Sequence, residues 1–224
     1  SEHAAVEVVP GPYDDAIAAS ARLADDRHIV ISDTAWPGYE QVPRDVIAGY
    51  RTIFAELAEA RVPPPSHVAI QMGVGALATA AILACPDARV VGAEPADAAC
   101  ILASVRAGAP TEVPGPHRSI MAGLNCGRPS PLAWPYLHAG LDLAVAIPDD
   151  AARVAVRALA DAGIVAGETG AAGLAGLLSL AAHPDWPAIR QRLGLDGSSH
   201  VLIIVTEGAT DPAAWTAITG RRLP

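Results

Sequence analysis

The stretch His67-Val-Ala-Ile-Gln-Met-Gly-Val-Gly-Ala-Leu-Ala78 decides the fold. Residues 67–71 predict a buried strand, Gly73 and Gly75 predict a tight turn, and the apolar run that follows predicts a helix to residue 84. A strand that passes through a glycine-rich turn into a helix is typical of parallel α/β sheets. Such a turn can hold a phosphate, because its N–H groups and the helix dipole face the anion. The alternative is a turn that only packs the helix closely against the sheet.

The same alternation continues along the chain on both sides of this unit. Strands are expected over residues 28–32, 67–71, 89–93, 141–147 and 200–205. Helices are expected over residues 13–25, 43–60, 96–107, 131–139, 149–162, 171–183 and 211–218. Most of these strands are apolar on both faces, which favours an α/β fold with a doubly wound, mostly parallel sheet covered by helices on both faces. Asp149 or Asp150 is the expected N-cap of one helix, and Glu168 or Thr169 of another.

Composition excludes several classes of protein. The chain has 224 residues, of which 51% are hydrophobic and 17% charged, with a net charge of −9. This balance excludes a disordered chain and disfavours nucleic acid as a partner. The longest apolar stretches, around residues 73–85 and 170–182, are shorter than the roughly 20 residues that a membrane-spanning helix needs. Neither the three cysteines nor the seven histidines show metal-ligand spacing, so we expect a reduced, cytoplasmic protein with no metal and no membrane contact.

All fifteen basic residues are arginine, and the chain contains no lysine. Arginine stays protonated and is a poor nucleophile, whereas lysine can form a Schiff base with a carbonyl group. Any mechanism that needs a lysine must therefore obtain it from outside this chain.

Candidate functional residues follow the predicted strands, because ligands of such sheets bind at the carboxyl ends of the strands. Asp33, in Asp33-Thr-Ala-Trp-Pro-Gly-Tyr39, is a carboxylate beside two aromatic residues, which suits either a general base or a turn cap. Thr206, in Thr206-Glu-Gly208, could donate a hydrogen bond to a heterocyclic nitrogen or serve a turn. A neutral hydroxyl partner leaves a pyridine nitrogen largely unprotonated.

Glu94 supports a different hypothesis. Residues 73–78 fit the pattern G-x-G-x-x-A, and Glu94 lies 19 residues after Gly75 at the end of the next strand. In a nicotinamide enzyme such an acid binds a ribose hydroxyl. The alternative function is therefore an NAD(P)-binding oxidoreductase, which leaves the segments around Asp33 and Thr206 unexplained.

Seven segments, taken together and in order, resemble the diaminopropionate ammonia-lyases, which are pyridoxal-phosphate enzymes of fold type II. They are Asp33-Thr-Ala-Trp-Pro-Gly-Tyr-Glu40, Gly49-Tyr50, Gln71-Met-Gly-Val-Gly75, Glu94-Pro95 with Cys100, Ile120-Met-Ala-Gly-Leu124, Gly167-Glu-Thr-Gly-Ala171 and Thr206-Glu-Gly208. The resemblance implies α,β-elimination from 2,3-diaminopropionate to pyruvate and ammonia, in a homodimer. It also implies that residues 1–35 are the last helix and strand of a small domain and residues 36–224 part of the large, cofactor-binding domain.

The same resemblance assigns roles to individual residues. Asp33 matches one of two acids that remove the α-proton, and Thr206 lies by the pyridine nitrogen. The residues expected to bind the cofactor, most of them around its phosphate, are Gly73, Val74, Gly75, Ala76, Leu77, Glu94 and Thr206. Ala76 stands where the wider group commonly has glycine, and its backbone N–H remains available.

The missing lysine is the main departure from the family pattern. In this family the Schiff-base lysine and the second acid lie in an N-terminal portion that has no match in this chain. We therefore expect a C-terminal fragment of the enzyme that is inactive without a lysine-bearing segment. The alternatives are a pseudoenzyme and a non-catalytic assembly partner of a lysine-bearing chain.

Overall fold

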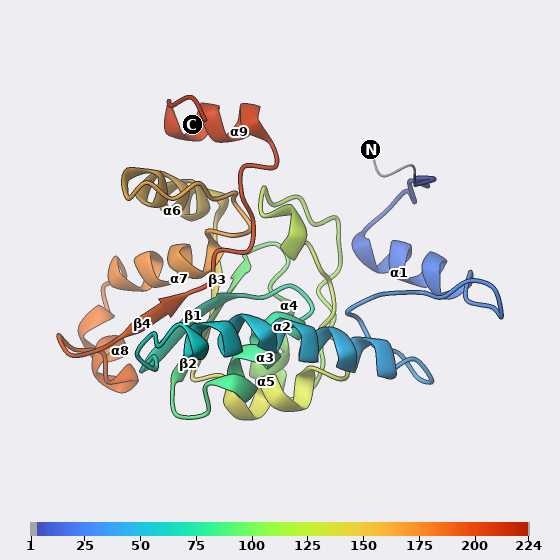
Figure 1. Cartoon of the computed structure of the whole chain (residues 1–224), viewed down its shortest axis with the longest axis horizontal. Coiled ribbons are helices and arrows are strands. Elements are labelled where there is room, and N and C mark those ends of the chain that lie inside the picture. Colours follow the sequence, from blue (N-terminus) through green and yellow to red (C-terminus); the bar gives the residue numbers. More distant parts are fainter. Residues whose placement is uncertain (1–3, 224) are drawn as a thin grey trace.

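The computed structural model describes residues 4–223 and is built on a four-stranded parallel sheet in the order β3-β2-β1-β4 (Figure 1). The strands are β1 (His67–Gln71), β2 (Arg89–Pro95), β3 (Leu143–Ile147) and β4 (Val201–Ile203). His67 at the start of β1 is in register with Arg89 of β2 and with Val201 of β4. Every pairing is parallel, which confirms the predicted α/β class.

Helices cover both faces of the sheet, as predicted for a doubly wound fold. One face carries α2 (Gln41–Glu59), α3 (Ala76–Ala84), α4 (Cys100–Ala107) and α5 (Trp134–Gly140). The other carries α6 (Asp149–Asp161), α7 (Ala172–Ala181) and α8 (Trp186–Leu193), with α9 (Pro212–Thr219) against α6. In Figure 1, α1 (Tyr13–Ala21) lies to one side of these layers, and the short 3-10 helix η1 (Ala122–Leu124) belongs to the long connection before α5.

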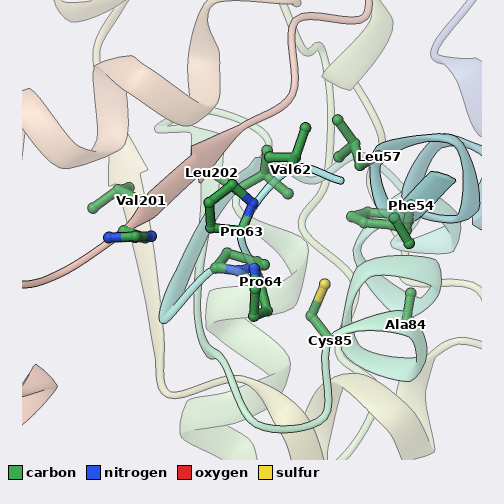
Figure 2. A pocket seen from close by; sticks show the side chains of 12 residues that line it. Phe54, Leu57, Val62, Pro63, Pro64, Ala84, Cys85, Val201 and Leu202 are labelled. Carbon is green, nitrogen blue, oxygen red and sulfur yellow. The ribbon is translucent and has the colours of Figure 1, made fainter. Parts of the chain in front are cut away.

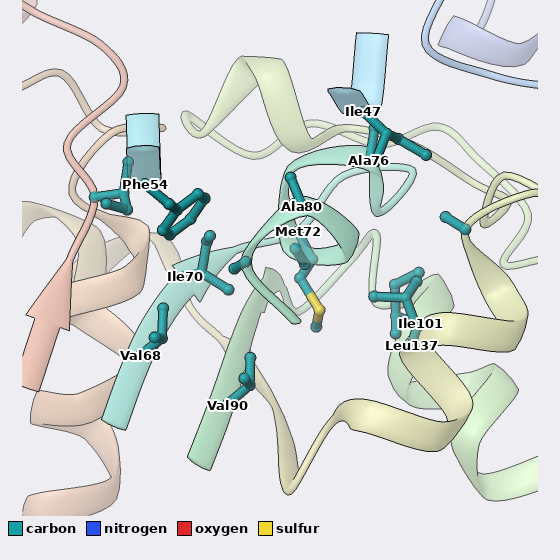
Figure 3. Packing of buried hydrophobic residues seen from close by; sticks show 14 of the residues in the cluster. Ile47, Phe54, Val68, Ile70, Met72, Ala76, Ala80, Val90, Ile101 and Leu137 are labelled. Atoms are coloured by element: carbon teal, nitrogen blue, oxygen red, sulfur yellow. The ribbon is translucent and has the colours of Figure 1, made fainter. Parts of the chain in front are cut away.

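The core has two halves because side chains of each strand alternate between the faces. Val68 and Ile70 of β1 pack with Phe54 of α2 on one face, and Figure 3 shows these side chains facing one another. Ala93 of β2 packs under α6 and α7 on the other face. Helix α7 approaches the sheet closely, since a Cβ added at Gly173 would lie 2.7 Å from the carbonyl oxygen of Ala69.

Two expected elements differ from the structure. Residues 28–32 form no strand within the described chain, and Ile29 and Ile31 are 85% and 79% exposed. Their apolar, β-branched character predicts a strand, but a strand forms only beside a partner, and these residues have none within 4–223. Helix α8 was not predicted, because its eight residues, Trp186-Pro-Ala-Ile-Arg-Gln-Arg-Leu193, are too few to show a helical period of apolar positions.

The predicted helix caps were wrong. Helix α6 begins after Pro148, and the Asp149 carboxylate instead accepts a 2.6 Å hydrogen bond from the Ser119 hydroxyl. The Thr169 hydroxyl likewise accepts from the backbone N–H of Gly123, at 3.2 Å. Both side chains bind a neighbouring loop rather than their own helix.

No helix in the part of the chain described here combines the length and the apolar character needed to cross a membrane. The predicted division at residue 35 stays a prediction.

Candidate cofactor site

A cavity of about 290 Å³ opens at the carboxyl ends of β1 and β4. The chain passes from β1 outward to β2 and β3 and returns to β4 on the other side, so this is the switch point where ligands of such sheets bind. Asp33, the predicted base, lines this cavity. Six of the residues predicted to bind the ligand also line it, namely Gly73, Val74, Gly75, Ala76, Leu77 and Thr206. The other lining residues are Tyr13, Tyr50, Gln71, Gly123, Leu124, Cys126 and Thr169.

The glycine-rich turn forms a cradle for an anion. Helix α3 begins at Ala76, and within residues 4–223 no side chain caps it, so the N–H groups of its first turn have no partner inside the helix. Gly75 adopts a left-handed conformation with φ of +100°, which glycine tolerates best. A Cβ at Gly73 would lie 3.2 Å from the Cys126 sulfur. The turn therefore presents backbone rather than side chains to the cavity, as a phosphate-binding loop does.

Thr206 and Gln71 face each other across the switch point. The Gln71 side-chain amide donates to the Thr206 hydroxyl at 2.6 Å. The other amide atom, Oε1, is buried and has no hydrogen-bond partner within the described residues. The pair thus presents a hydroxyl, and an acceptor still unpaired, at the wall of the cavity.

Asp33 enters the cavity from the connector before α2. The Tyr13 hydroxyl donates to its Oδ1 at 3.3 Å, as does the Thr34 hydroxyl at 3.3 Å. Burial, together with the Asp33 charge, raises the pKa of both Tyr13 and Tyr50. Both phenols therefore stay protonated and can donate hydrogen bonds beside the carboxylate.

The aromatic residues after Asp33 shape its loop. Trp36 and Tyr39 stack with ring centroids 3.9 Å apart across the Pro37-Gly38 turn. The Tyr39 hydroxyl donates to the Val30 carbonyl at 2.8 Å and accepts from the Ser32 N–H at 2.9 Å. The aromatics thus fold the segment back on itself, while Tyr13 supplies the phenol beside the carboxylate.

Ser130 joins this loop to the phosphate cradle. Its hydroxyl accepts from the Ala35 N–H at 3.1 Å, and its own N–H donates to the Val74 carbonyl at 2.9 Å. Ser130 is only 1% exposed. One buried residue therefore holds two functional segments that lie far apart in the sequence.

Glu207 fixes the opposite wall. Its carboxylate accepts from the Thr169 N–H at 3.1 Å and from the Thr210 hydroxyl at 3.0 Å, and its carbonyl accepts from the Gly167 N–H at 2.9 Å. The predicted helix entry at residues 167–173 thereby becomes part of the site.

Glu94 lies elsewhere. It is 0% exposed, it is not among the residues lining the cavity, and its carboxylate accepts 2.8 Å hydrogen bonds from the N–H groups of Ile101 and Leu102 at the start of α4. Burial raises its pKa to about 8, against the opposing effect of these two donors. This placement does not support direct contact of Glu94 with a cofactor, and it leaves no acid for a ribose in the way the nicotinamide hypothesis requires.

Burial keeps two thiols in and near the site protonated. Burial raises the pKa of Cys126, which lines the cavity, to about 12, and raises that of Cys100 further. Cys126 therefore packs as a small protonated residue. Residues 4–223 contain no group of three side chains that could hold a metal ion.

A larger cavity, of about 440 Å³, lies at the opposite end of β1 and β4. Figure 2 shows its lining of Phe54, Leu57, Cys85, Val201 and the prolines 63 and 64. The side chains of this lining are apolar apart from Cys85 and His200. Side chains that could act on a polar ligand converge instead in the smaller cavity.

The comparisons with known proteins identify the family of the chain. Residues 1–207 match the family model described as pyridoxal-phosphate dependent enzyme. The chain is 33% identical to diaminopropionate ammonia-lyase of Salmonella typhimurium over 225 residues, covering 92% of this chain and 56% of that protein. It is 34% identical to the Escherichia coli K12 enzyme over 214 residues, covering 89% and 54%. It thus spans about half the length of these curated relatives.

Solved structures give the same result. The Escherichia coli diaminopropionate ammonia lyase in complex with an aminoacrylate-PLP azomethine reaction intermediate matches with a TM-score of 0.81 at 32% identity, covering 92% of this chain and 56% of that one. Maize serine racemase matches with a TM-score of 0.62 at 26% identity, covering 77% and 51%. From the family match over nearly its whole length, this chain belongs to the pyridoxal-phosphate dependent enzymes.

Proposed function

We propose that this chain is the cofactor- and substrate-holding part of an ammonia-lyase that converts 2,3-diaminopropionate and water to pyruvate and two molecules of ammonia. The observation that carries the proposal is the convergence of a phosphate cradle, a hydroxyl and a carboxylate in one cavity. The names of the relatives support the substrate, and the family supports pyridoxal phosphate as cofactor.

The residues present fit that cofactor. The N–H groups at residues 73–77 would hold its phosphate, and the Thr206 hydroxyl would meet its ring nitrogen. When bound, pyridoxal phosphate supplies an electron sink for charge that develops at the substrate α-carbon. The protein binds and orients the cofactor and the substrate, and it moves protons.

Asp33 is the group we assign to the α-proton. A carboxylate accepts this proton as a general base when it lies within hydrogen-bonding reach. The Tyr13 phenol, which stays protonated, holds the carboxylate toward the cavity. One acid reaches one face of the substrate, so we propose that a second acid outside this chain serves the other enantiomer.

Besides the second acid, we assign the Schiff-base lysine to a segment outside this chain. With fifteen arginines and no lysine, the chain cannot attach the cofactor covalently through its own side chains. We propose that a lysine-bearing segment completes the site, that the chain alone is inactive, and that the complete enzyme is a homodimer. Three free cysteines support a reducing cytoplasm as its location.

The test starts from the protein isolated from its natural host, by intact mass and by denaturing gel. We expect either a mass above 22.8 kDa or a lysine-bearing companion chain. Pyruvate and ammonia are then measured from each enantiomer of diaminopropionate, with this chain alone and with the complete protein.

We expect product only from the complete protein. Turnover by the isolated chain would overturn the requirement for an external lysine. A complete protein that binds pyridoxal phosphate but releases no ammonia would overturn the reaction and favour the non-catalytic alternatives.

A further inference from the structure

Gln71 is the buried polar residue of the cavity that the proposed function leaves without a role. It ends the central strand β1 and is 3% exposed. Its Nε2 lies 2.6 Å from the Thr206 hydroxyl oxygen, which is a short hydrogen bond. The contact crosses the switch point from β1 to the segment after β4.

The direction of this bond fixes the character of Thr206. An amide NH₂ only donates, so the Thr206 oxygen must be the acceptor in the pair. The single hydrogen of the hydroxyl is then free to point elsewhere, and Thr206 lines the cavity. A hydroxyl held in this way offers its hydrogen to a ligand.

The other end of the amide points to a role beyond packing. Oε1 of Gln71 is buried without a hydrogen-bond partner in residues 4–223. A buried amide that serves only structure is normally paired at both ends, because an unpaired buried polar atom is costly. A half-paired glutamine against a ligand cavity is typical of a functional site.

We infer that Gln71 is a positioning residue that makes the Thr206 hydroxyl a hydrogen-bond donor to the ring nitrogen of the cofactor. This inference rests on the proposed function. Without Gln71 the hydroxyl could donate to an unprotonated ring nitrogen or accept from a protonated one. With Gln71 in place, the amide occupies one of the two acceptor positions of the hydroxyl oxygen and leaves its hydrogen to be donated, so an unprotonated ring nitrogen is the favoured partner.

Other titratable groups near the ring site do not duplicate this role. Glu207, directly after Thr206, has its carboxylate engaged by Thr169 and Thr210. The remaining titratable residues of the lining come from α1, the connector, α2 and the loop after η1, and they are Tyr13, Asp33, Tyr50 and Cys126.

The probe for the test is pyridoxine 5′-phosphate labelled with ¹⁵N in the ring. It has no aldehyde, so its binding does not need a lysine. The ¹⁵N chemical shift reports directly whether the bound ring nitrogen carries a proton. We expect an unprotonated ring nitrogen at pH 7 in the unaltered chain.

Two variants of Gln71 change the expected signal in a graded way. Gln71→Met keeps the length of the side chain and removes the amide, so the protonated fraction should rise. Gln71→Glu places an acceptor against Thr206 and should raise that fraction further. In a Thr206→Val background, Gln71→Met should cause no additional shift, since the two residues act through one contact.

A measurement on the unaltered chain avoids any effect of substitution on folding. Pyridoxine phosphate methylated at the ring nitrogen cannot accept a hydrogen bond. We expect it to bind roughly tenfold or more weakly than the parent, because the Thr206 hydroxyl loses its acceptor. The difference should shrink in Gln71→Met.

The outcomes separate this inference from the proposed function. If pyridoxine phosphate binds neither this chain nor the complete protein, the cofactor site itself is wrong and the inference falls with it. If it binds with a protonated ring nitrogen in the unaltered chain, the inference alone is overturned. The same holds if the ¹⁵N shift is equal in the unaltered chain and in a folded Gln71→Met.

Discussion

The carboxylates of this chain take their chemistry from their surroundings rather than from their spacing. Glu94 has the spacing of a ribose-binding acid, yet its carboxylate lies against the first N–H groups of α4. Asp33 has no diagnostic spacing, yet it reaches the cavity. The two residues are therefore tested by different experiments: Glu94 by its effect on stability and Asp33 by its effect on turnover.

Glu94 makes stability depend on pH. Its pKa is raised from 4.5 to about 8 by burial, so the folded chain retains a proton that the unfolded chain releases above pH 4.5. The contribution of Glu94 to the free energy of unfolding should therefore be highest below that pH and fall until about pH 8, by at most about 5 kcal/mol. This pH dependence is measured by urea unfolding of the unaltered chain and of Glu94→Gln at several pH values across the range.

Glu94→Gln cannot ionise, so its stability should lack this part of the pH dependence. At low pH this substitution should also lower the free energy of unfolding by about 1 kcal/mol, because the NH₂ group of the glutamine cannot accept a hydrogen bond from the second backbone N–H. Equal pH dependence in the two proteins would contradict the assignment.

Asp33→Asn removes the base that we assign to the α-proton. In the complete enzyme, kcat on one enantiomer should fall by roughly 10² to 10⁴-fold, because an amide cannot accept that proton. Steady-state assays on each enantiomer measure the effect, with the exposed Asp26→Asn as matched control. Unchanged rates on both enantiomers would remove Asp33 from the mechanism.

At the scale of elements, the strand–turn–helix unit around Gly75 sets the geometry of the phosphate cradle. A Cβ at Gly75 would lie 2.4 Å from Cδ1 of Leu137 in α5, and the left-handed φ of +100° is strained for any other residue. Gly75→Ala should therefore lower the free energy of unfolding by roughly 1–3 kcal/mol and weaken phosphate binding.

Gly49→Ala is the matched control. Gly49 lies in the exposed middle of α2, and nothing lies within 4 Å of its added Cβ. That substitution should stabilise the chain by about 0.5–1 kcal/mol. Chemical unfolding and titration with pyridoxine phosphate distinguish the two. A Gly75→Ala chain as stable as the Gly49→Ala chain would show that the turn tolerates a side chain.

The elements that the sequence predicts well are those whose pattern is local. Residues 67–84 carry their own strand, turn and helix signals, and the structure confirms them. Residues 28–32 carry a strand signal that depends on a distant partner, so the prediction was wrong. For the same reason the cavity could be anticipated at Gly73, Asp33 and Thr206 but not at Gln71, whose role depends on a contact 135 positions away.

At the scale of the whole molecule, the sheet with its two layers of helices contrasts with the segment before it. Every residue of α1 is at least partly exposed, and residues 22–29 are exposed throughout. Contacts such as that between Asp14 and the Gly127 N–H, at 3.1 Å, attach α1 to the rest. The division proposed near residue 35 follows this contrast.

Limited proteolysis tests that division. Trypsin should make its first internal cut after Arg22 or Arg27, because this exposed segment can adapt to a protease more easily than the helices that carry most other arginines. The remaining large fragment should still unfold cooperatively in urea. Mass spectrometry identifies the cut, and Arg22→Gln with Arg27→Gln should abolish it. A first cut after residue 35 would place the weak point inside the large domain.

Ser130 gives the molecule a property that no single functional residue has. Because one buried residue supports the Asp33 loop through its hydroxyl and the Val74 carbonyl of the cradle through its backbone N–H, ordering either segment restricts the other. Thermodynamic coupling of this kind is reciprocal. An anion bound in the cradle thus favours the position of Asp33 in the cavity. A substrate that binds Asp33 in that position in turn raises the affinity for the anion. Cofactor and substrate are thereby expected to bind with positive cooperativity, transmitted through a single serine.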